Sequence, residues 1–228
     1  MRPANEALIV IDVQNDFCPN GALAVLDGDT IVAPINAMLP DFAARILTQD
    51  WHPRGHKSFA SSYNGKSAYD VIDMPYGSQV LWPDHCIQST DGAAFHNGLK
   101  TQTADLIIRK GFRPQIDSYS AFFENDKTTP TGLEGYLRTR GLDTLTIVGL
   151  ATDFCVAYSA LDAARLGLEV TVDMTACRGI DLACSLDAAL FPMHAPGVQL
   201  LHDSVGHPSS ESHAHSIPQR PRPSVYST

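Results

Sequence analysis

The sequence predicts an α/β fold, a three-layer αβα sandwich around a central, mainly parallel six-stranded sheet. Two observations favour this class. Short runs of apolar, strand-forming residues recur along the chain, and segments of helical character separate several of them. The runs are also almost unbroken in their apolar character, which is typical of strands that are buried on both faces of a sheet.

Six apolar runs are the candidate strands. In chain order they are ALIVID (7–12), RILTQD (45–50), DLIIRK (105–110), LTIVGL (145–150), LEVTVDM (168–174) and VQLL (198–201). Helical segments are expected between several of these runs, around residues 29–43, 131–140, 154–166 and 183–193. The interval 51–104 is rich in Gly, Pro, Ser, His and Asp, so it predicts irregular structure over the edge of the sheet. Loops of that length usually carry function.

Length and composition predict one folded domain followed by a tail. The chain has 228 residues, of which 44% are hydrophobic and 18% charged, and this is enough to bury one sizeable core. We assign residues 1–205 to the domain. Residues 206–228 are polar and rich in proline, so they contribute little to a core. His213 and His215 in this segment are expected to be solvated tail residues.

Charge and hydropathy restrict the class of partner. A formal net charge of -9 argues against a general affinity for nucleic acid or for an anionic membrane surface, because both require a basic face. No apolar run approaches the roughly 18 residues that cross a bilayer, and the N-terminus turns acidic too early for a signal peptide. We therefore expect a cytoplasmic protein that acts on a small molecule. A homo-oligomer is compatible with the sequence.

The cysteines predict free thiols. They are odd in number, show no CxxC spacing and occur at positions 18, 86, 155, 177 and 184. In a chain without an export signal, this pattern makes a disulfide framework improbable. Packing or a passive role is expected for four of them, and one, Cys155, stands where reactivity is plausible.

Chemically capable side chains stand at the ends of the predicted strands. Asp12, Asp50 and Lys110 end the first three, and Cys155 follows the fourth at a predicted helix start. Each alone has an ordinary structural explanation, since Asp caps turns, Lys is usually solvated and Cys is often a small buried hydrophobe. Ligands of open α/β sheets bind at the carboxyl ends of strands, so the four side chains are expected to converge on one crevice.

Cys155 is placed as a nucleophile. A thiol at a helix N-terminus is exposed to unpaired N–H groups and to the positive end of the helix dipole, and both stabilise a thiolate. The same N–H groups can hold the oxyanion that forms when the thiolate attacks an amide carbonyl. Asp12 could then transfer the proton, with Lys110 orienting its carboxylate.

A second set of residues predicts a metal site. Asp50 and His52 flank one residue in DWHPRGH (50–56), and His85 comes from WPDHC (82–86) at the far end of the long loop. Two imidazoles and a carboxylate suit zinc, iron or manganese. Structural histidines are commoner than ligands, but the position at a strand's carboxyl end favours a metal. His56 is interpreted as a residue that supports either the metal ligands from outside or the loop.

The segments that carry these residues, taken together, resemble bacterial nicotinamidases, which belong to the isochorismatase-like cysteine hydrolases. The matching segments are IDVQNDFCPNGAL, TQDWHPRGHKSFAS, LWPDHCIQ, IRKGFRPQIDSYSAFFEN and GLATDFCVAYSALDA. The likeness runs in order from about residue 7 to residue 201. It implies the isochorismatase-like hydrolase fold and an amidase that converts nicotinamide to nicotinic acid and ammonia in NAD salvage, with pyrazinamide as a further substrate.

The resemblance also implies roles for individual residues. Asp12 would transfer protons, Lys110 would be its partner, and Cys155 would form a thioester. One divalent metal ion, zinc before iron or manganese, would be held by Asp50, His52 and His85 and would bind the pyridine nitrogen. Further implied residues are Phe17, Trp82 and Tyr119 in the pocket lining, and the N–H groups of Ala151 and Cys155 in an oxyanion hole next to a cis peptide between Leu150 and Ala151. Phe154 departs from the Tyr or His of many relatives, which removes any hydrogen bond made there.

Two other functions remain as alternatives. One is an amidase of the same superfamily that acts on a carbamoyl or maleamic-acid type of substrate. Such relatives generally lack the metal set that this chain has. The other is a binding protein without catalytic activity on the same fold, and the intact set of Asp12, Lys110 and Cys155 argues against it.

Overall fold

The computed structural model describes residues 2–194 and 197–202 of the chain. Within these ranges, six strands form one parallel sheet in the order β5-β2-β1-β6-β7-β8. Their bounds are β1 Glu6–Ile11, β2 Ala44–Asp50, β5 Leu106–Lys110, β6 Thr144–Leu150, β7 Glu169–Arg178 and β8 Val198–Leu201. Each predicted apolar run is a strand, so the predicted α/β class is confirmed, and all six strands are parallel.

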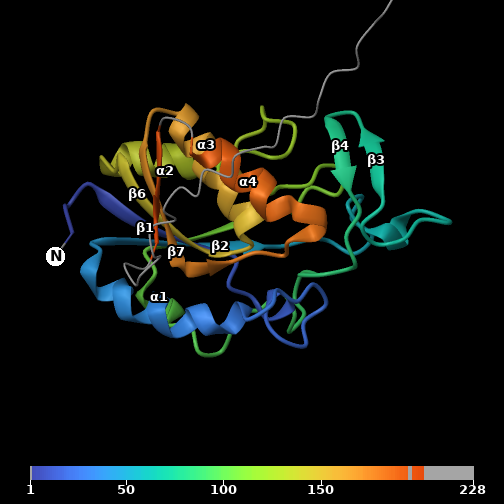
Figure 1. Cartoon of the computed structure of the whole chain (residues 1–228), viewed down its shortest axis with the longest axis horizontal. Helices are drawn as coiled ribbons and strands as arrows, with labels where there is room; N and C mark the ends of the chain where they lie inside the picture. Colours follow the sequence, from blue (N-terminus) through green and yellow to red (C-terminus); the bar gives the residue numbers. More distant parts are fainter. Residues whose placement is uncertain (1, 195–196, 203–228) are drawn as a thin grey trace, which may run out of the picture.

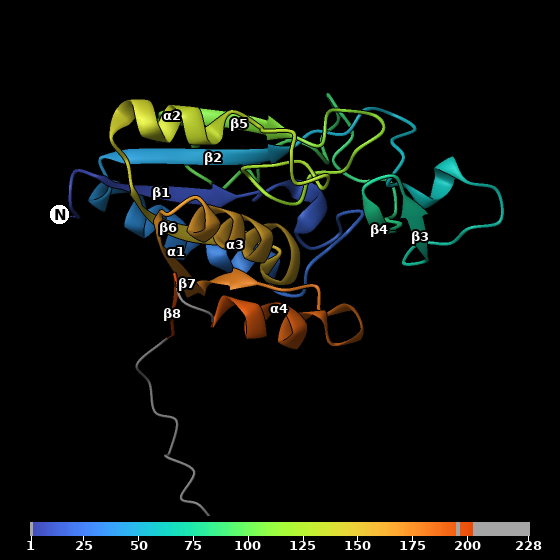
Figure 2. The ribbon, with the colours of Figure 1, turned by 90° about the horizontal axis from the view of Figure 1, so that it is seen from above.

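Helices cover both faces of this sheet. They are α1 Val32–Met38, α2 Leu133–Arg140, α3 Ala157–Arg165 and α4 Ser185–Met193. Figure 1 shows α1 on one face and α2, α3 and α4 on the other, and Figure 2 shows the strands side by side in the order given above. None of the helices in the described ranges is long and apolar enough to cross a membrane.

The two faces bury separate hydrophobic cores, and β1 contributes to both. Ile9 belongs to the core under α2 and α3, whereas Leu8 and Val10 belong to the core under α1. Successive residues of a strand point to opposite faces, so a strand with helices on both sides must be apolar at every position. This explains why the sequence of β1 shows no alternation.

The chain reverses its direction of winding between β1 and β6. From β1 it proceeds to β2 and β5 on one side, and then to β6, β7 and β8 on the other. Such a reversal leaves a crevice beyond the carboxyl ends of the two central strands, which is where open α/β sheets bind ligands. Asp12 follows β1 and Cys155 follows β6, so both enter this crevice.

The sequence predicts irregular structure for the whole interval 51–104, but the structure contains a β-hairpin there. Strands β3 Val71–Met74 and β4 Gly77–Val80 form an antiparallel hairpin. Figures 1 and 2 both show the hairpin beyond the carboxyl ends of the central strands. Its strands have four residues each, and most of their side chains are exposed or half-buried, so they carry little of the apolar signal that marks a core strand.

The predicted tail falls outside the described residues. Its boundary at residue 206, together with His213 and His215, therefore stays a prediction. The last described strand, β8, ends at Leu201.

Candidate active site

Four of the predicted residues, Asp12, Asp50, Lys110 and Cys155, meet at the carboxyl ends of the sheet strands. The Lys110 ammonium lies 2.9 Å from Asp12 Oδ2 and 3.2 Å from Asp50 Oδ1. It also donates hydrogen bonds to Cys155 Sγ at 3.4 Å and to the Ser118 carbonyl at 2.8 Å. One buried cation therefore joins the candidate nucleophile, the candidate base and a candidate metal ligand.

Asp12 is held in position by its own backbone and by the neighbouring strand. It directly follows β1 and has a φ of 46°, a conformation that is uncommon outside glycine. Thr48 of β2 donates its hydroxyl to Asp12 Oδ1 at 2.6 Å and accepts the Asp12 N–H at 3.1 Å. These contacts turn the carboxylate toward Lys110 and leave Oδ2 for the ammonium.

Cys155 lies in a wide helical turn rather than at the first residue of a helix. The segment Thr152–Val156 is π-helical and leads directly into α3. The Val156 N–H donates to the Ala151 carbonyl, and Ser159 Oγ donates to the Cys155 carbonyl. The Leu150–Ala151 peptide is cis, as the resemblance implied. This turn places the thiol, 7% exposed, against Lys110.

The resting nucleophile is a thiol, which differs from the expected thiolate. Burial raises the pKa of Cys155 well above its usual value, and the carboxylates of Asp12 and Asp50 raise it further, while Lys110 acts in the opposite direction. Burial likewise raises the pKa of Asp12, against the opposing charge of Lys110. A carboxylate with a raised pKa is a better base for this thiol than an ordinary aspartate.

Lys110 stays charged despite its burial. Burial lowers the pKa of Lys110, but Asp12, Asp50 and the Cys155 sulfur together raise it well above its usual value. The ammonium is therefore a fixed positive charge between the thiol and two carboxylates. Such a charge favours any negative charge that develops on the sulfur.

The second predicted set also converges. His52 Nε2 lies 3.0 Å and His85 Nε2 3.3 Å from the same oxygen, Asp50 Oδ2. All three side chains are buried, and their ligand atoms lie within 4.8 Å of one another. Although burial raises the pKa of Asp50, His52 and Lys110 lower it well below its usual value, so the carboxylate is ionised.

The residues around this set prepare it for a metal ion. His52 Nδ1 is 2.9 Å from the Gly111 carbonyl and His85 Nδ1 is 2.8 Å from the Pro83 carbonyl. A carbonyl accepts a proton from Nδ1, which leaves Nε2 of each ring with its lone pair for a metal. Gly111 also has a φ of 68°, and a Cβ there would meet the His52 ring at 2.6 Å. The donor set fits a divalent transition metal.

His56 supports the loop, as the sequence predicted. Its Nε2 lies 2.8 Å from the Arg113 carbonyl, and its Nδ1 lies 2.7 Å from Ser58 Oγ. The ring packs 4.5 Å from that of His52, measured between centroids. Because both nitrogens have protein partners, His56 holds the segment that carries His52.

A small cavity connects the two sets. Cys155 and Ala151 line one part, and Asp50 and His85 line another. The remaining walls are largely aromatic or aliphatic, and they consist of Phe17, Leu23, Trp82, Tyr119, Phe154 and Ile180. Phe17, Trp82 and Tyr119 are the three pocket residues that the resemblance implied.

The aromatic walls brace one another. Trp82 Nε1 donates to the Tyr119 hydroxyl at 3.0 Å. Phe154 packs edge-on against Trp82, with 4.9 Å between the ring centroids, and against Tyr119 at 5.6 Å. Phe154 therefore contributes an apolar ring to the cavity, where a Tyr or His would add a polar group.

Sequence reasoning missed one polar wall of the cavity, Asp117. This residue lies in the quoted segment IRKGFRPQIDSYSAFFEN, seven positions after Lys110. It is buried and its Oδ1 is 3.8 Å from His52 Nε2. Its place in a segment without secondary structure gave no periodicity to mark it. The only available signal was an acidic residue between Lys110 and Tyr119.

The other cysteines lie outside this cavity, and all five are free of disulfides, as predicted. Cys18, Cys86 and Cys177 are buried, and burial raises the pKa of each. Cys184 is exposed, so packing does not apply to it, and of the two predicted roles a passive one is left.

Comparison with known proteins identifies the family. The model of the isochorismatase domain matches residues 6–202. The chain is 54% identical over 200 residues to the nicotinamidase of Acinetobacter baylyi, covering 87% of this chain and 94% of that protein. The structure of the Acinetobacter baumanii nicotinamidase pyrazinamidase is 55% identical and superposes with a TM-score of 0.87, covering 88% of this chain and 97% of that one.

A pyrazinamidase of Pyrococcus horikoshii solved in complex with zinc extends the likeness to a more distant protein. It is 35% identical, covers 86% of this chain and 98% of its own, and has a TM-score of 0.70. The matched range of residues 6–202 contains every strand of the sheet and both sets of side chains that line the cavity. The chain therefore belongs to the isochorismatase domain family.

Proposed function

We propose that the chain hydrolyses nicotinamide to nicotinic acid and ammonia through a thioester on Cys155, in the salvage of NAD in the cytoplasm. The observation that carries this proposal is the cavity that joins Cys155 to Asp50 and His85 between aromatic walls. An aromatic amide with a polar ring atom matches this arrangement, with its amide at the sulfur and its ring atom at the metal cluster. The nicotinamidase relatives support the same substrate.

The first half of the reaction forms the thioester. Asp12 takes the thiol proton of Cys155 as the sulfur bonds to the amide carbon, and Lys110 offsets the charge that gathers on the sulfur. The carbonyl oxygen gains a negative charge, which we assign to the backbone N–H groups of Ala151 and Cys155. When the C–N bond breaks, Asp12 returns its proton to the nitrogen and ammonia leaves.

The second half regenerates the enzyme. Water attacks the thioester carbon while Asp12 accepts one of its protons. The C–S bond then breaks, Asp12 protonates the sulfur, and nicotinic acid leaves. Asp12 thus serves as base and acid in turn, which explains why its carboxylate is held by both Thr48 and Lys110 rather than by one partner.

Asp50, His52 and His85 would hold one divalent metal ion, for which zinc is our first choice and iron or manganese are alternatives. The ion, when bound, supplies a Lewis acid for the ring nitrogen of the substrate. The zinc complex of the Pyrococcus horikoshii pyrazinamidase supports this choice. The protein's contribution is to fix both imidazoles through the Gly111 and Pro83 carbonyls, so that the substrate ring is oriented before the attack.

The pocket walls define the class of substrate. Phe17, Trp82, Tyr119 and Phe154 form an aromatic slot with few polar atoms, which suits a flat heteroaromatic ring. Pyrazinamide, which keeps both the amide and the ring nitrogen, is therefore a second proposed substrate. Carbamoyl and maleamic-acid substrates have no ring nitrogen that a metal ion at the far end of such a slot could bind.

Release of ammonia tests the function. Purified protein with zinc is incubated with nicotinamide, pyrazinamide, N-carbamoylsarcosine and maleamic acid. We expect turnover of the first two compounds, and nicotinic acid in amounts equal to the ammonia from nicotinamide. Turnover of only N-carbamoylsarcosine or maleamic acid would indicate one of the other amidases of the superfamily. If no compound is turned over, a binding protein without catalytic activity is favoured.

A further inference from the structure

Asp117 belongs to the cavity but has no part in the proposed reaction. The residue lies between β5 and α2, in the same loop as Tyr119, and lines the cavity together with Asp50 and His85. Its side chain is 2% exposed. Oδ1 is 3.8 Å from His52 Nε2, the same nitrogen that faces Asp50 Oδ2. Asp117 therefore lies beside the metal cluster, next to the same His52 nitrogen that Asp50 faces.

The basic side chain next to Asp117 is His52, which belongs to the metal cluster. Asp117 and His52 also form a possible ligand group with His56, but both nitrogens of His56 already have protein partners. Among the described residues, His52 is the only basic side chain within 4.0 Å of Asp117. A metal ion at the Asp50 cluster is thus the cation that Asp117 can reach.

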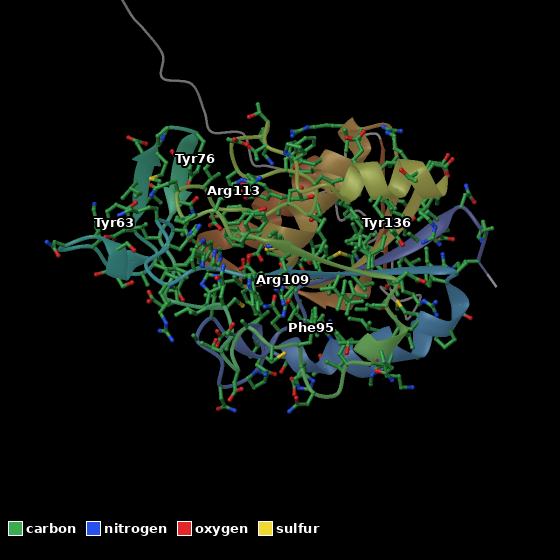
Figure 3. The ribbon with its side chains drawn as sticks, turned by 180° about the vertical axis from the view of Figure 1, so that it is seen from behind. Tyr63, Tyr76, Phe95, Arg109, Arg113 and Tyr136 are labelled. Carbon is green, nitrogen blue, oxygen red and sulfur yellow. The ribbon has the colours of Figure 1, made fainter. Side chains whose placement is uncertain are left out.

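Neutral donors fix the carboxylate in this position. Gln79 Nε2 donates to Asp117 Oδ2 at 3.0 Å, and the Ser118 N–H donates to Oδ1 at 2.8 Å. Gln79 comes from β4 and is held in turn by the hydroxyl of Tyr76, the hairpin residue labelled in Figure 3. Asn125 donates to the same Gln79 oxygen. The hairpin therefore fixes an acidic side chain without neutralising it.

The charges of the site are unbalanced without a cation. Asp12, Asp50 and Asp117 are buried carboxylates, and Lys110 is the one buried lysine or arginine beside them among the described residues. Three carboxylates therefore share one lysine and the His52 imidazole. A buried charge is costly unless it is compensated, and a divalent cation would compensate the carboxylates that these two side chains leave unpaired.

We propose that Asp117 is the second anionic group of the metal centre and sets the affinity of the site for its divalent ion. The inference rests on the metal site of the proposed function and adds a residue outside the Asp50, His52 and His85 set. Asp117 is a positioning residue in this role, because its charge acts on the ion and not on the reacting amide.

Metal affinity of the full-length apoprotein tests the proposal. Zinc is titrated against a chromophoric chelator in the presence of wild type or Asp117→Asn, a change that keeps the shape of the side chain and removes its charge. We expect the zinc dissociation constant to rise by about 10 to 100-fold. Asp162→Asn is the matched control, since Asp162 is equally buried but pairs with Lys127 and Arg165 away from the cavity, and it should leave zinc affinity unchanged.

Thermal melting of the same proteins separates charge from structural damage. Asp117→Asn removes the buried charge and also one of the two acceptors that Gln79 and Ser118 use, so the Tm of the apoprotein should change little. The rise in Tm that saturating zinc produces should shrink. The proposal is overturned if the zinc dissociation constant of Asp117→Asn lies within threefold of the wild-type value. It is also overturned if the apoprotein Tm of the variant falls so far that structural damage accounts for the loss of zinc affinity. Wild type that binds no zinc overturns the metal site as well, so the two failures are distinguishable.

Discussion

Lys110 is the residue on which the chemistry of the site depends. Its ammonium contacts Asp12, Asp50 and Cys155, and the charges of the two carboxylates keep it protonated in a buried position. The same cation lowers the pKa of both the thiol and Asp12, in opposition to burial. Burial raises the pKa of Asp12, whereas the pKa of Asp50 is held low, so Asp12 is the better acceptor for the proton that must leave Cys155.

Replacing the nucleophile should abolish turnover and spare the fold. Cys155→Ala removes the only thiol that lines the cavity, so we expect no ammonia release from nicotinamide. Because the change removes little side-chain volume, the Tm should stay close to that of wild type. Calorimetric titration should still detect nicotinamide binding. Cys184→Ala, at an exposed cysteine, is the control and should keep full activity. Measurable turnover by Cys155→Ala would exclude the thioester.

Removing the base should be almost as damaging. Asp12→Asn keeps the shape of the side chain, but it cannot accept the thiol proton, and it leaves Lys110 with one carboxylate in place of two. We expect kcat to fall by about 10²-fold or more. Steady-state ammonia release measures this loss. A variant that kept more than roughly a tenth of the wild-type rate would require another base.

At the scale of the element, the close approach of β1 and β6 sets the distance between base and nucleophile. Ile11 pairs with Gly149 at the carboxyl ends of the two strands, one residue before Asp12 and six before Cys155. A Cβ on Gly149 would lie 2.1 Å from the Ile11 carbonyl oxygen, and the φ of Gly149 is 124°. Only glycine fits here, because both the space and the backbone conformation exclude a side chain.

Gly149→Ala should consequently damage stability and activity together. We expect a loss of more than about 2 kcal/mol in the free energy of unfolding and a drop in kcat, because β1 and β6 must separate below the site. Gly135→Ala in α2 is the matched control, since nothing lies within 4 Å of its added Cβ. It should be stabilised by about 0.5 to 1 kcal/mol. Denaturant unfolding measures both, and a neutral Gly149→Ala would contradict the packing described.

At the scale of the whole molecule, two groups of elements meet in one cavity. The carboxyl edge of the sheet and the turn after β6 supply Asp50 and Cys155, and the long segment between β2 and β5 supplies His85 and Trp82. Substrate selection should therefore depend on the long segment as well as on the sheet.

Benzamide tests this division, because it has the ring and amide of nicotinamide but no ring nitrogen. We expect its kcat/KM to be lower than that of nicotinamide by more than about 10³-fold, since a site built to bind a polar atom rejects an analogue without it. His85→Ala should raise KM for nicotinamide and reduce the difference in kcat/KM between nicotinamide and benzamide. If metal-free enzyme at ordinary nicotinamide concentration still released a full first-turnover burst of ammonia, the orienting role of the metal would be wrong.

Deleting the segment after Gly206 tests the domain boundary. None of the residues assigned to the site lies beyond Cys155 except Ile180 in the pocket wall, so we expect kcat, KM and Tm to match those of the full chain. A large fall in rate or in Tm would mean that the tail is part of the folded body.

The sequence by itself determined the strands, the parallel sheet and the places of Asp12, Asp50, Lys110 and Cys155 at its carboxyl edge. These features depend on local apolar runs and on the geometry of parallel sheets, both of which can be read along the chain. The remaining site residues, including those of the pocket lining, were predicted because the motif segments resemble those of a known family.

Only the tertiary structure decided the protonation of Cys155, the hairpin and the position of Asp117. The pKa of the thiol depends on burial and on Asp12, Asp50 and Lys110, which come from three other strands. The hairpin matters through Gln79, which reaches Asp117 across 38 residues of sequence. Burial and through-space charge arise from contacts between distant segments, so no local pattern in the sequence records them.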